Sequence, residues 1–189
     1  EIGSGLVGSE MCIRDRVYLL CTDGVAEFDL TTQRFKTLLQ GNVDAIYFNE
    51  KLYIGKREEV FVYNESTGNF DLYYHLAGKD ITLSCLRLDE KKNLWMGTTS
   101  NGLYCLSGDK KISQPVTRGN IASIYEDSSK ELWICTWEEG LYRIKTDSTI
   151  ENFRHDPKNP NSICTDFVRS CCEDNAGNLW IGTFHGLNR

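Results

Sequence analysis

The chain has 189 residues, of which 40% are hydrophobic and 25% are charged, proportions that are typical of a folded globular chain and not of a disordered one. The formal net charge is -6 and the 21 Lys and Arg residues are scattered, so the sequence offers no basic stripe for a nucleic-acid backbone. No apolar run approaches the roughly 18 to 20 residues needed to cross a bilayer, so we expect no membrane contact by this segment.

The first 16 residues do not fit the pattern of the remaining chain. Residues 1–16 contain no copy of the repeat described below, and the run from Gly8 to Arg16 resembles translated sequencing-adaptor sequence. We therefore predict that residues 1–16 are a non-native or artefactual leader, and we derive the fold from residues 17–189.

A short aromatic segment recurs five times along residues 17–189. Three copies, at 94–98, 132–136 and 179–183, are nearly identical and carry tryptophan at their second position. Two weaker copies, at 17–22 and 52–56, carry tyrosine at their second position. Successive aromatic positions are separated by about 35 to 47 residues, close to the repeat length of a four-stranded propeller blade.

The segments that flank each aromatic copy predict strands and not helices. Apolar and polar residues alternate before the aromatic copies, as at 121–126 and 167–172, which is the period of a β-strand. A polar turn rich in Asp and Asn separates each pair of strands, and a glycine after the aromatic strand starts a second hairpin. Those glycines are Gly102, Gly140 and Gly186. A fourth strand is predicted through 70–74 and through 150–154.

These patterns predict an all-β fold, a β-propeller fragment of four-stranded antiparallel blades with about three whole blades and two partial ones. The predicted blades are residues 17–42 (partial), 43–80, 81–119, 120–163 and 164–189 (partial). A single blade cannot bury both of its faces, so neighbouring blades must stack, and we expect the remaining blades elsewhere in the parent chain.

The repeated aromatic residues have two interpretations. They occupy fixed places within strands, which favours a structural role in filling the gap between blades. The alternative is a platform on which sugar rings stack. The residues are Tyr53, Trp95, Trp133 and Trp180.

A ligand site is predicted on the loops at one face of the blades. In a four-stranded meander, the turn after the second strand and the link between blades emerge on the same face. Trp137 is one candidate there, because it belongs to no repeated core position. The predicted set is Arg57, Asn101, Trp137, Glu138, Phe184 and His185, together with the linker at 155–161. An ordinary solvated rim is the alternative.

The cysteines and histidines form no recognisable metal or disulfide framework. No Cys-x-x-Cys pair occurs, and most cysteines fall within strand patterns, so we predict buried free thiols. His75, His155 and His185 are isolated, and no nucleophile elbow or phosphate loop is visible. We therefore predict no catalytic residue, no metal and no cofactor. The cysteines in strand patterns are Cys21, Cys85, Cys105, Cys135, Cys171 and Cys172.

Residues 174–189 resemble the two-component regulator propeller repeat, and residues 153–163 resemble the linker between blades of the same family. The resemblance covers roughly 17–189, is strongest in the last three copies, and is weaker at Lys56 and Glu59, which replace the usual Thr and Gly.

The resemblance implies a ligand-sensing segment of a hybrid two-component sensor histidine kinase of gut Bacteroidetes. It implies a periplasmic location on an inner-membrane protein, recognition of an oligosaccharide and signalling to transcription. The implied partners are the oligosaccharide, the remaining blades and the kinase region of the parent chain, and a second copy in a homodimer. The segment itself would not be an enzyme.

Two other functions stay open on the residues alone. One is a soluble propeller enzyme of the lyase or lactonase type, and the other is a scaffold for protein partners. An enzyme would need metal ligands or acids on its innermost strands. Those strands supply a mixed set without histidine, which counts against the enzyme: Asp44, Arg87, Glu126 and Arg169.

Overall fold

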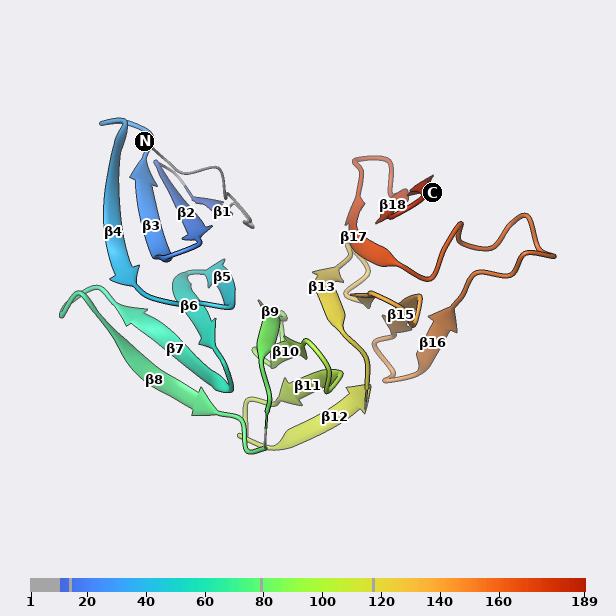
Figure 1. Ribbon diagram of the computed structural model, residues 1–189, viewed down its shortest axis with the longest axis horizontal. Helices are drawn as coiled ribbons and strands as arrows, with labels where there is room; N and C mark the ends of the chain where they lie inside the picture. Colours follow the sequence, from blue (N-terminus) through green and yellow to red (C-terminus); the bar gives the residue numbers. More distant parts are fainter. Residues whose placement is uncertain (1–10, 14, 79, 117) are drawn as a thin grey trace. The chain divides into compact units, whose positions relative to one another are not determined.

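The computed structural model describes residues 11–13, 15–78, 80–116 and 118–189, with no account of the side chains of 11–13. All regular elements of these residues are β-strands, and none is a helix, as Figure 1 shows. This part of the chain therefore contains no helix of the length and hydrophobicity needed to span a membrane. The predicted all-β class is confirmed. The chain divides into two compact units, 1–86 and 87–189, which are described separately.

The first unit contains two four-stranded antiparallel sheets, in the orders β1-β2-β3-β4 and β5-β6-β7-β8. The strands of the first sheet are β1 (Met11–Ile13), β2 (Arg16–Cys21), β3 (Gly24–Asp29) and β4 (Arg34–Gln40). Those of the second sheet are β5 (Ala45–Asn49), β6 (Lys51–Lys56), β7 (Glu59–Asn64) and β8 (Asn69–His75).

The predicted leader includes the first strand of the first sheet. Strand β1 pairs with β2, so that Cys12 lies opposite Val17. Residues 1–10 and 14 lie outside the described residues. The artefactual origin of 1–16 stays a prediction.

The second unit continues the same meander, and its boundary with the first falls within β9. Its sheets have the orders β12-β11-β10-β9, β13-β14-β15-β16 and β17-β18-β19. The strands of the first of these are β9 (Leu83–Leu88), β10 (Leu94–Thr98), β11 (Leu103–Leu106) and β12 (Ile112–Val116). The second has β13 (Ile121–Glu126), β14 (Leu132–Thr136), β15 (Leu141–Ile144) and β16 (Ile150–Phe153). The third has β17 (Val168–Glu173), β18 (Leu179–Thr183) and β19 (Gly186–Asn188).

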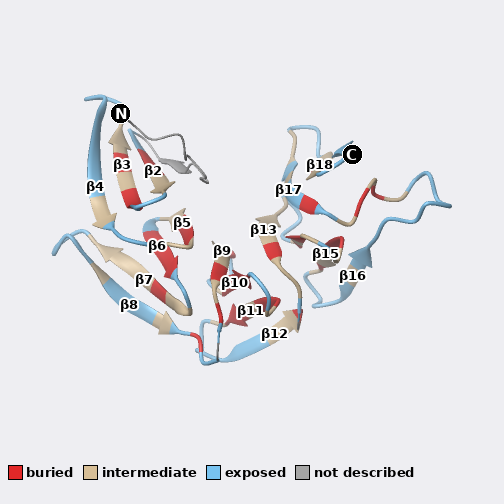
Figure 2. Ribbon diagram, viewed as in Figure 1, coloured by how far each residue is buried: buried red, intermediate tan, exposed pale blue. Residues whose placement is uncertain are grey.

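Burial changes from strand to strand within each sheet, as Figure 2 shows. Every residue of β10 is buried, whereas most residues of the fourth strands β8 and β16 are exposed. In the second unit, an apolar cluster forms where β14 and β17 contact each other. Its buried members are Cys135, Leu141, Ile163, Val168 and Ile181. Adjacent sheets in this unit are therefore held together by apolar side chains of their inner strands.

An aspartate at the start of the first hairpin turn holds the repeated tryptophan in three sheets. The bonds from indole Nε1 to Asp Oδ2 are Trp95 to Asp89 at 2.9 Å, Trp133 to Asp127 at 2.8 Å and Trp180 to Asp174 at 2.8 Å. The other oxygen of Asp89 accepts the backbone N–H of Asn93 at 2.8 Å, which closes the turn. One carboxylate thus satisfies a turn amide and an indole together.

A threonine and a glycine close the second hairpin in the same three sheets. Thr136 Oγ1 donates to the carbonyl of Gly140 at 2.7 Å and accepts the backbone N–H of Glu139 at 2.9 Å. Gly140 has φ +76°, and a Cβ atom at this position would overlap the carbonyl oxygen of Phe153. Only glycine fits here. Thr98 with Gly102 and Thr183 with Gly186 make the same hydroxyl-to-carbonyl bond, at 2.8 and 2.9 Å.

We expect the Asp89→Ala substitution to lower the free energy of unfolding by about 2 to 3 kcal/mol, because it leaves the buried Trp95 N–H and the Asn93 amide without their acceptor. Urea unfolding of the full chain, followed by tryptophan fluorescence, measures this. Asp109→Ala is the matched control, because Asp109 pairs with Lys111 in an exposed hairpin and should leave the midpoint nearly unchanged. Equal effects of the two substitutions would contradict the prediction.

Low pH should weaken the hydrogen bond between Trp180 and Asp174 in the sheet β17–β19. Hydrogen bonds from the Trp180 indole and from Asn178 hold the pKa of the Asp174 carboxyl well below its usual value of 3.8. The ionised carboxylate therefore stabilises the fold above that value, and its contribution is lost as the pH falls below it towards the folded-state pKa. We expect the difference in melting temperature between the wild type and Asp174→Asn to be largest above about pH 5 and to shrink towards pH 2. A difference that is constant with pH would contradict this.

The Gly140→Ala substitution should destabilise the chain more than Gly68→Ala. Both glycines have positive φ, +76° and +71°, but nothing lies within 4 Å of a Cβ atom at Gly68. Gly68→Ala should therefore cost only the backbone strain of about 1 kcal/mol, and Gly140→Ala at least about 2 kcal/mol more. Denaturant unfolding of the two variants measures the difference in their free energies of unfolding. Because the two glycines have similar φ, this difference reports the steric overlap with the carbonyl oxygen of Phe153.

Candidate ligand-binding site

The structure brings together only part of the predicted loop set. Trp137 and Glu138 lie in the β14–β15 loop, and Phe184 and His185 lie between β18 and β19, all in the second unit. Asn101 is also in the second unit, where its backbone bridges Gly119. Arg57 belongs to the first unit, in a tight β6–β7 turn whose backbone N–H is accepted by Asp44 at 2.6 Å. The site described below therefore does not include Arg57.

Three aromatic side chains from two sheets form a cluster that we call the aromatic platform: Trp137, Phe167 and Phe184. The Trp137 and Phe184 ring centroids are 5.6 Å apart, and those of Phe167 and Phe184 are 6.2 Å apart. Phe184 is 58% exposed and Phe167 is 40% exposed. The guanidinium of Arg169 lies over the Trp137 ring, 5.2 Å from its centroid. Much of the platform is thus apolar surface open to solvent.

Backbone hydrogen bonds fix the positions of the platform residues. The Trp137 N–H donates to the carbonyl of Asn120 at 3.0 Å, and the Phe184 N–H donates to the carbonyl of Phe167 at 3.1 Å. The platform therefore rests on loops whose backbones are tied to neighbouring segments, and these backbones need little ordering before a ligand binds.

A surface hollow of about 380 Å³ opens beside Trp137. Its size falls in the range of small-molecule sites. The residues around it offer hydroxyl, amide and carboxylate groups next to one indole. They are Thr99, Ser100, Gly119, Asn120, Trp137, Glu138 and Glu139. A flat apolar ring beside several hydrogen-bonding groups is suited to a ligand that has both apolar faces and hydroxyl groups.

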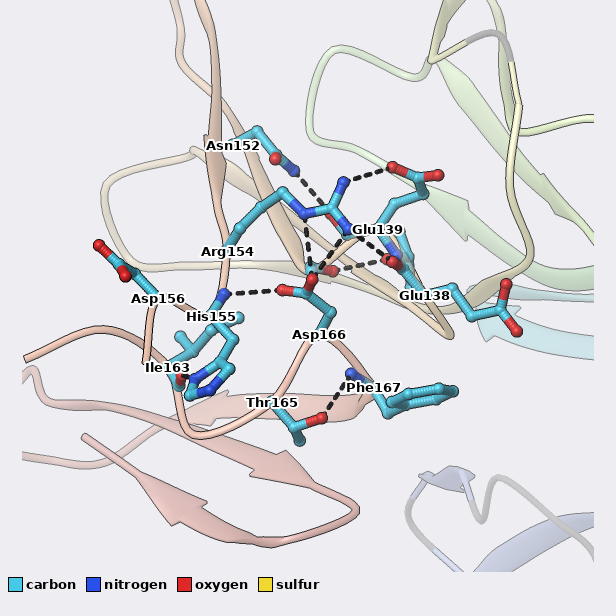
Figure 3. A network of polar contacts seen from close by, with 12 residues as sticks. Glu138, Glu139, Asn152, Arg154, His155, Asp156, Ile163, Thr165, Asp166 and Phe167 are labelled. Atoms are coloured by element: carbon cyan, nitrogen blue, oxygen red, sulfur yellow. Dashed lines mark hydrogen bonds and ion pairs between the residues drawn. The ribbon is translucent and has the colours of Figure 1, made fainter. Parts of the chain in front are cut away.

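Arg154 clamps the β14–β15 loop to the linker that follows β16, as Figure 3 shows. Its Nη1 lies 2.9 Å from Glu139 Oε2, and its Nη2 donates to the carbonyl of Glu138 at 2.9 Å. The same guanidinium binds Asp166 Oδ2 through Nε at 3.1 Å and Nη2 at 2.8 Å. The bond with Asp166 raises the pKa of Arg154, so this clamp stays charged. The loop that carries Trp137 is thereby held to the linker.

The histidines near the site take part in hydrogen bonds that involve backbone groups. His155 Nδ1 is 2.8 Å from the carbonyl oxygen of Ile163, and the His155 N–H donates to Asp166 Oδ1 at 2.7 Å. The His185 N–H donates to Thr183 Oγ1 at 3.3 Å. Among the residues that the structure describes, no three His, Cys, Asp or Glu side chains are grouped to hold a metal ion.

The repeated aromatic side chains contact residues of their own sheets. Trp95 is only 8% exposed and Tyr53 only 6%, and the Tyr53 ring meets Tyr73 edge to face at 5.4 Å. Trp133 stacks on Phe153 at 5.9 Å. The acids and bases predicted for the innermost strands are also engaged elsewhere, since Arg87 pairs with Glu126 at 3.6 Å and Arg169 covers Trp137.

Four residues of the site were not singled out in the sequence. Phe167 carries no repeat signal, and Arg154, Asp166 and Asn120 act through contacts made across 12 to 17 positions of the chain. The only available signal was the lead-in at 153–163, whose resemblance to a family linker places Arg154 between two blades.

Comparison with known proteins assigns the repeat. Residues 162–185 match the family described as Two component regulator propeller. No curated protein matches the chain.

Several solved structures share the fold. An extracellular domain of a hybrid two component system from B. thetaiotaomicron is 21% identical, with a TM-score of 0.80, and the match covers 94% of this chain and 26% of that one. A second such domain from the same organism is 22% identical, with a TM-score of 0.75 and coverages of 92% and 24%. A streptogramin B lyase is 15% identical, with a TM-score of 0.72 and coverages of 96% and 67%.

The chain spans about a quarter of the length of the two extracellular domains. At these identities the likeness establishes the fold. The chain is therefore a β-propeller segment, and its residues 162–185 match the two component regulator propeller repeat.

Proposed function

We propose that this segment is part of the ligand-sensing region of a hybrid two-component sensor histidine kinase, and that the aromatic platform binds an oligosaccharide. The observation that carries the proposal is the platform itself, an aromatic surface to which the family repeat at 162–185 contributes Phe167 and Phe184. The fold shared with extracellular domains of hybrid two component systems supports the sensor role.

The proposal includes the setting of the segment in its parent protein. We place it in the periplasm, as a portion of an inner-membrane protein whose remaining blades and kinase region complete the signalling chain to transcription. A homodimer of the parent is part of the same proposal. The parent reading frame tests this setting directly, because it should encode further blades, a membrane span and a histidine kinase. A frame that encodes a propeller without a membrane span would overturn it.

Sugar binding follows from the chemistry of the site. The C–H faces of a sugar ring can pack on Trp137 and Phe184, while its hydroxyl groups reach the hydrogen-bonding groups of the adjacent hollow. Glu139 is already paired with Arg154, so it is available mainly as an oriented hydrogen-bond acceptor. The site thus offers stacking and hydrogen bonding to a neutral, polyhydroxylated ligand.

The alternative is a lyase-like enzyme, because the streptogramin B lyase shares the fold. Sensor and enzyme are separated by incubating the chain with an oligosaccharide, recovering the oligosaccharide and analysing it. A sensor returns the oligosaccharide unchanged, and an enzyme returns a new product.

We expect Trp137→Ala to weaken oligosaccharide binding by about tenfold or more, since Trp137 belongs both to the platform and to the hollow beside it. The measurement is calorimetric titration of the full chain with oligosaccharides from starch, xylan, pectin and mucin. Phe35→Ala is the control, because Phe35 is 53% exposed on β4 in the first unit and should leave binding unchanged. No binding by any member of this panel, or equal loss in both variants, would refute the sugar site.

A further inference from the structure

Two cysteine thiols from neighbouring sheets meet inside the apolar cluster of the second unit. Cys135 lies on β14 and Cys171 on β17, and their Sγ atoms are 3.6 Å apart. Cys135 belongs to the buried cluster that joins the two sheets, together with Val168 and Ile181, and Cys171 packs against it. The two residues are 36 positions apart in the chain. The fold thus places two thiols almost in bonding contact across a junction between sheets.

The cysteine next in sequence faces the other way. Successive side chains of a strand point to opposite faces, and Cys172 is exposed whereas Cys171 is half-buried. The prediction of buried thiols is therefore wrong for Cys172. It holds for Cys105 and Cys135, which are buried. Among the thiols of the described residues, Cys171 is the one that the structure pairs with Cys135.

We propose that Cys135 and Cys171 are a cross-linking site, at which a disulfide joins the sheet β13–β16 to the sheet β17–β19. A disulfide bond is about 2.05 Å long, so the two sulfur atoms must approach by roughly 1.5 Å. The proposal requires that rotation of the two side chains brings the sulfur atoms together while the sheets stay packed. The inference concerns the stability of the segment and does not depend on the proposed ligand.

The oxidant is a disulfide, either of a small thiol such as glutathione or of a protein oxidant outside the cytoplasm. The half-buried Cys171 loses its proton to solvent and attacks that disulfide, which releases one thiolate and leaves a mixed disulfide. Cys135 then loses its proton and attacks Cys171 Sγ, which forms the Cys135–Cys171 bond and releases the second thiolate. Two protein thiols are oxidised and one disulfide of the oxidant is reduced to two thiols, so the atoms and electrons balance.

The buried position of the pair determines how fast the exchange runs. The hydrogen bond with Cys135 and burial both raise the pKa of the Cys171 thiol, so few molecules carry the reactive thiolate at neutral pH. Oxidation of the folded chain should therefore be slow. Oxidation during refolding should be faster, because both thiols are then open to solvent.

The test uses the full chain with Cys172→Ser, which removes the exposed competitor, refolded from urea in a buffer of oxidised and reduced glutathione. We expect the loss of two free thiols per chain and of the mass of two hydrogen atoms. Trypsin should then release residues 131–143 joined to residues 170–189, and a reductant should separate them. The melting temperature of the oxidised chain should rise by on the order of 5 °C above that of its reduced form.

Two matched variants decide the assignment. In the same Cys172→Ser background, Cys135→Ser should abolish the cross-linked peptide and the rise in melting temperature, and Cys105→Ser should abolish neither, although Cys105 is equally a buried strand cysteine. A chain that keeps both thiols free, that carries only mixed glutathione disulfides, or that joins other cysteines would overturn the proposal. None of these outcomes decides whether the platform binds an oligosaccharide, which is measured separately.

Discussion

Each sheet of the second unit is fixed at its first hairpin by a carboxylate that accepts an indole N–H. Asp127 bonds Trp133 across the β13–β14 turn, and its second oxygen accepts the backbone N–H of Glu131 at 2.9 Å. The bond ties a turn to the strand that follows it, so the strand register and the turn geometry are set together. Once β13 and β14 are in register, the side chains of β14 alternate between the two faces of the sheet. Trp133 and Cys135 then share one face, on which the neighbouring sheet packs.

The candidate site depends on the position of β14, because the β14–β15 loop that follows this strand carries Trp137. The Thr136–Gly140 closure ends β14 and turns the chain so that Trp137 and Glu138 are displayed between two strands. Arg154 then fastens this loop to the linker of the next sheet through Glu139 and Asp166. A loop held from both sides can present the half-buried Trp137 in one orientation. This explains how an aromatic residue outside the repeat becomes part of an ordered surface.

The sequence predicted the fold well because the fold is repetitive. The aromatic copy, the polar turn and the glycine each recur at fixed offsets, and the period and alternation of residues translate directly into strands and hairpins. The residues of the candidate site do not recur at fixed offsets from one repeat to the next. Trp137 stood out because it interrupts the pattern, whereas Phe167 matches the apolar positions of an ordinary strand. The hydrogen bond that the Trp95 indole donates to Asp89 could not be predicted from the polar turn alone, because it needs the strand register to bring the two side chains together.

The contact between β14 and β17 carries both the platform and the thiol pair. Trp137 follows β14, Phe167 precedes β17, and Cys135 and Cys171 face each other between these strands. A ligand that stacks on rings from both sheets binds only when the two sheets are docked. A bond between the two cysteines favours the same docked arrangement. Ligand binding and the disulfide both favour the docked state of the two sheets, so thermodynamic linkage requires that each strengthens the other. The oxidised chain should therefore bind the ligand of the platform at least as tightly as the reduced chain.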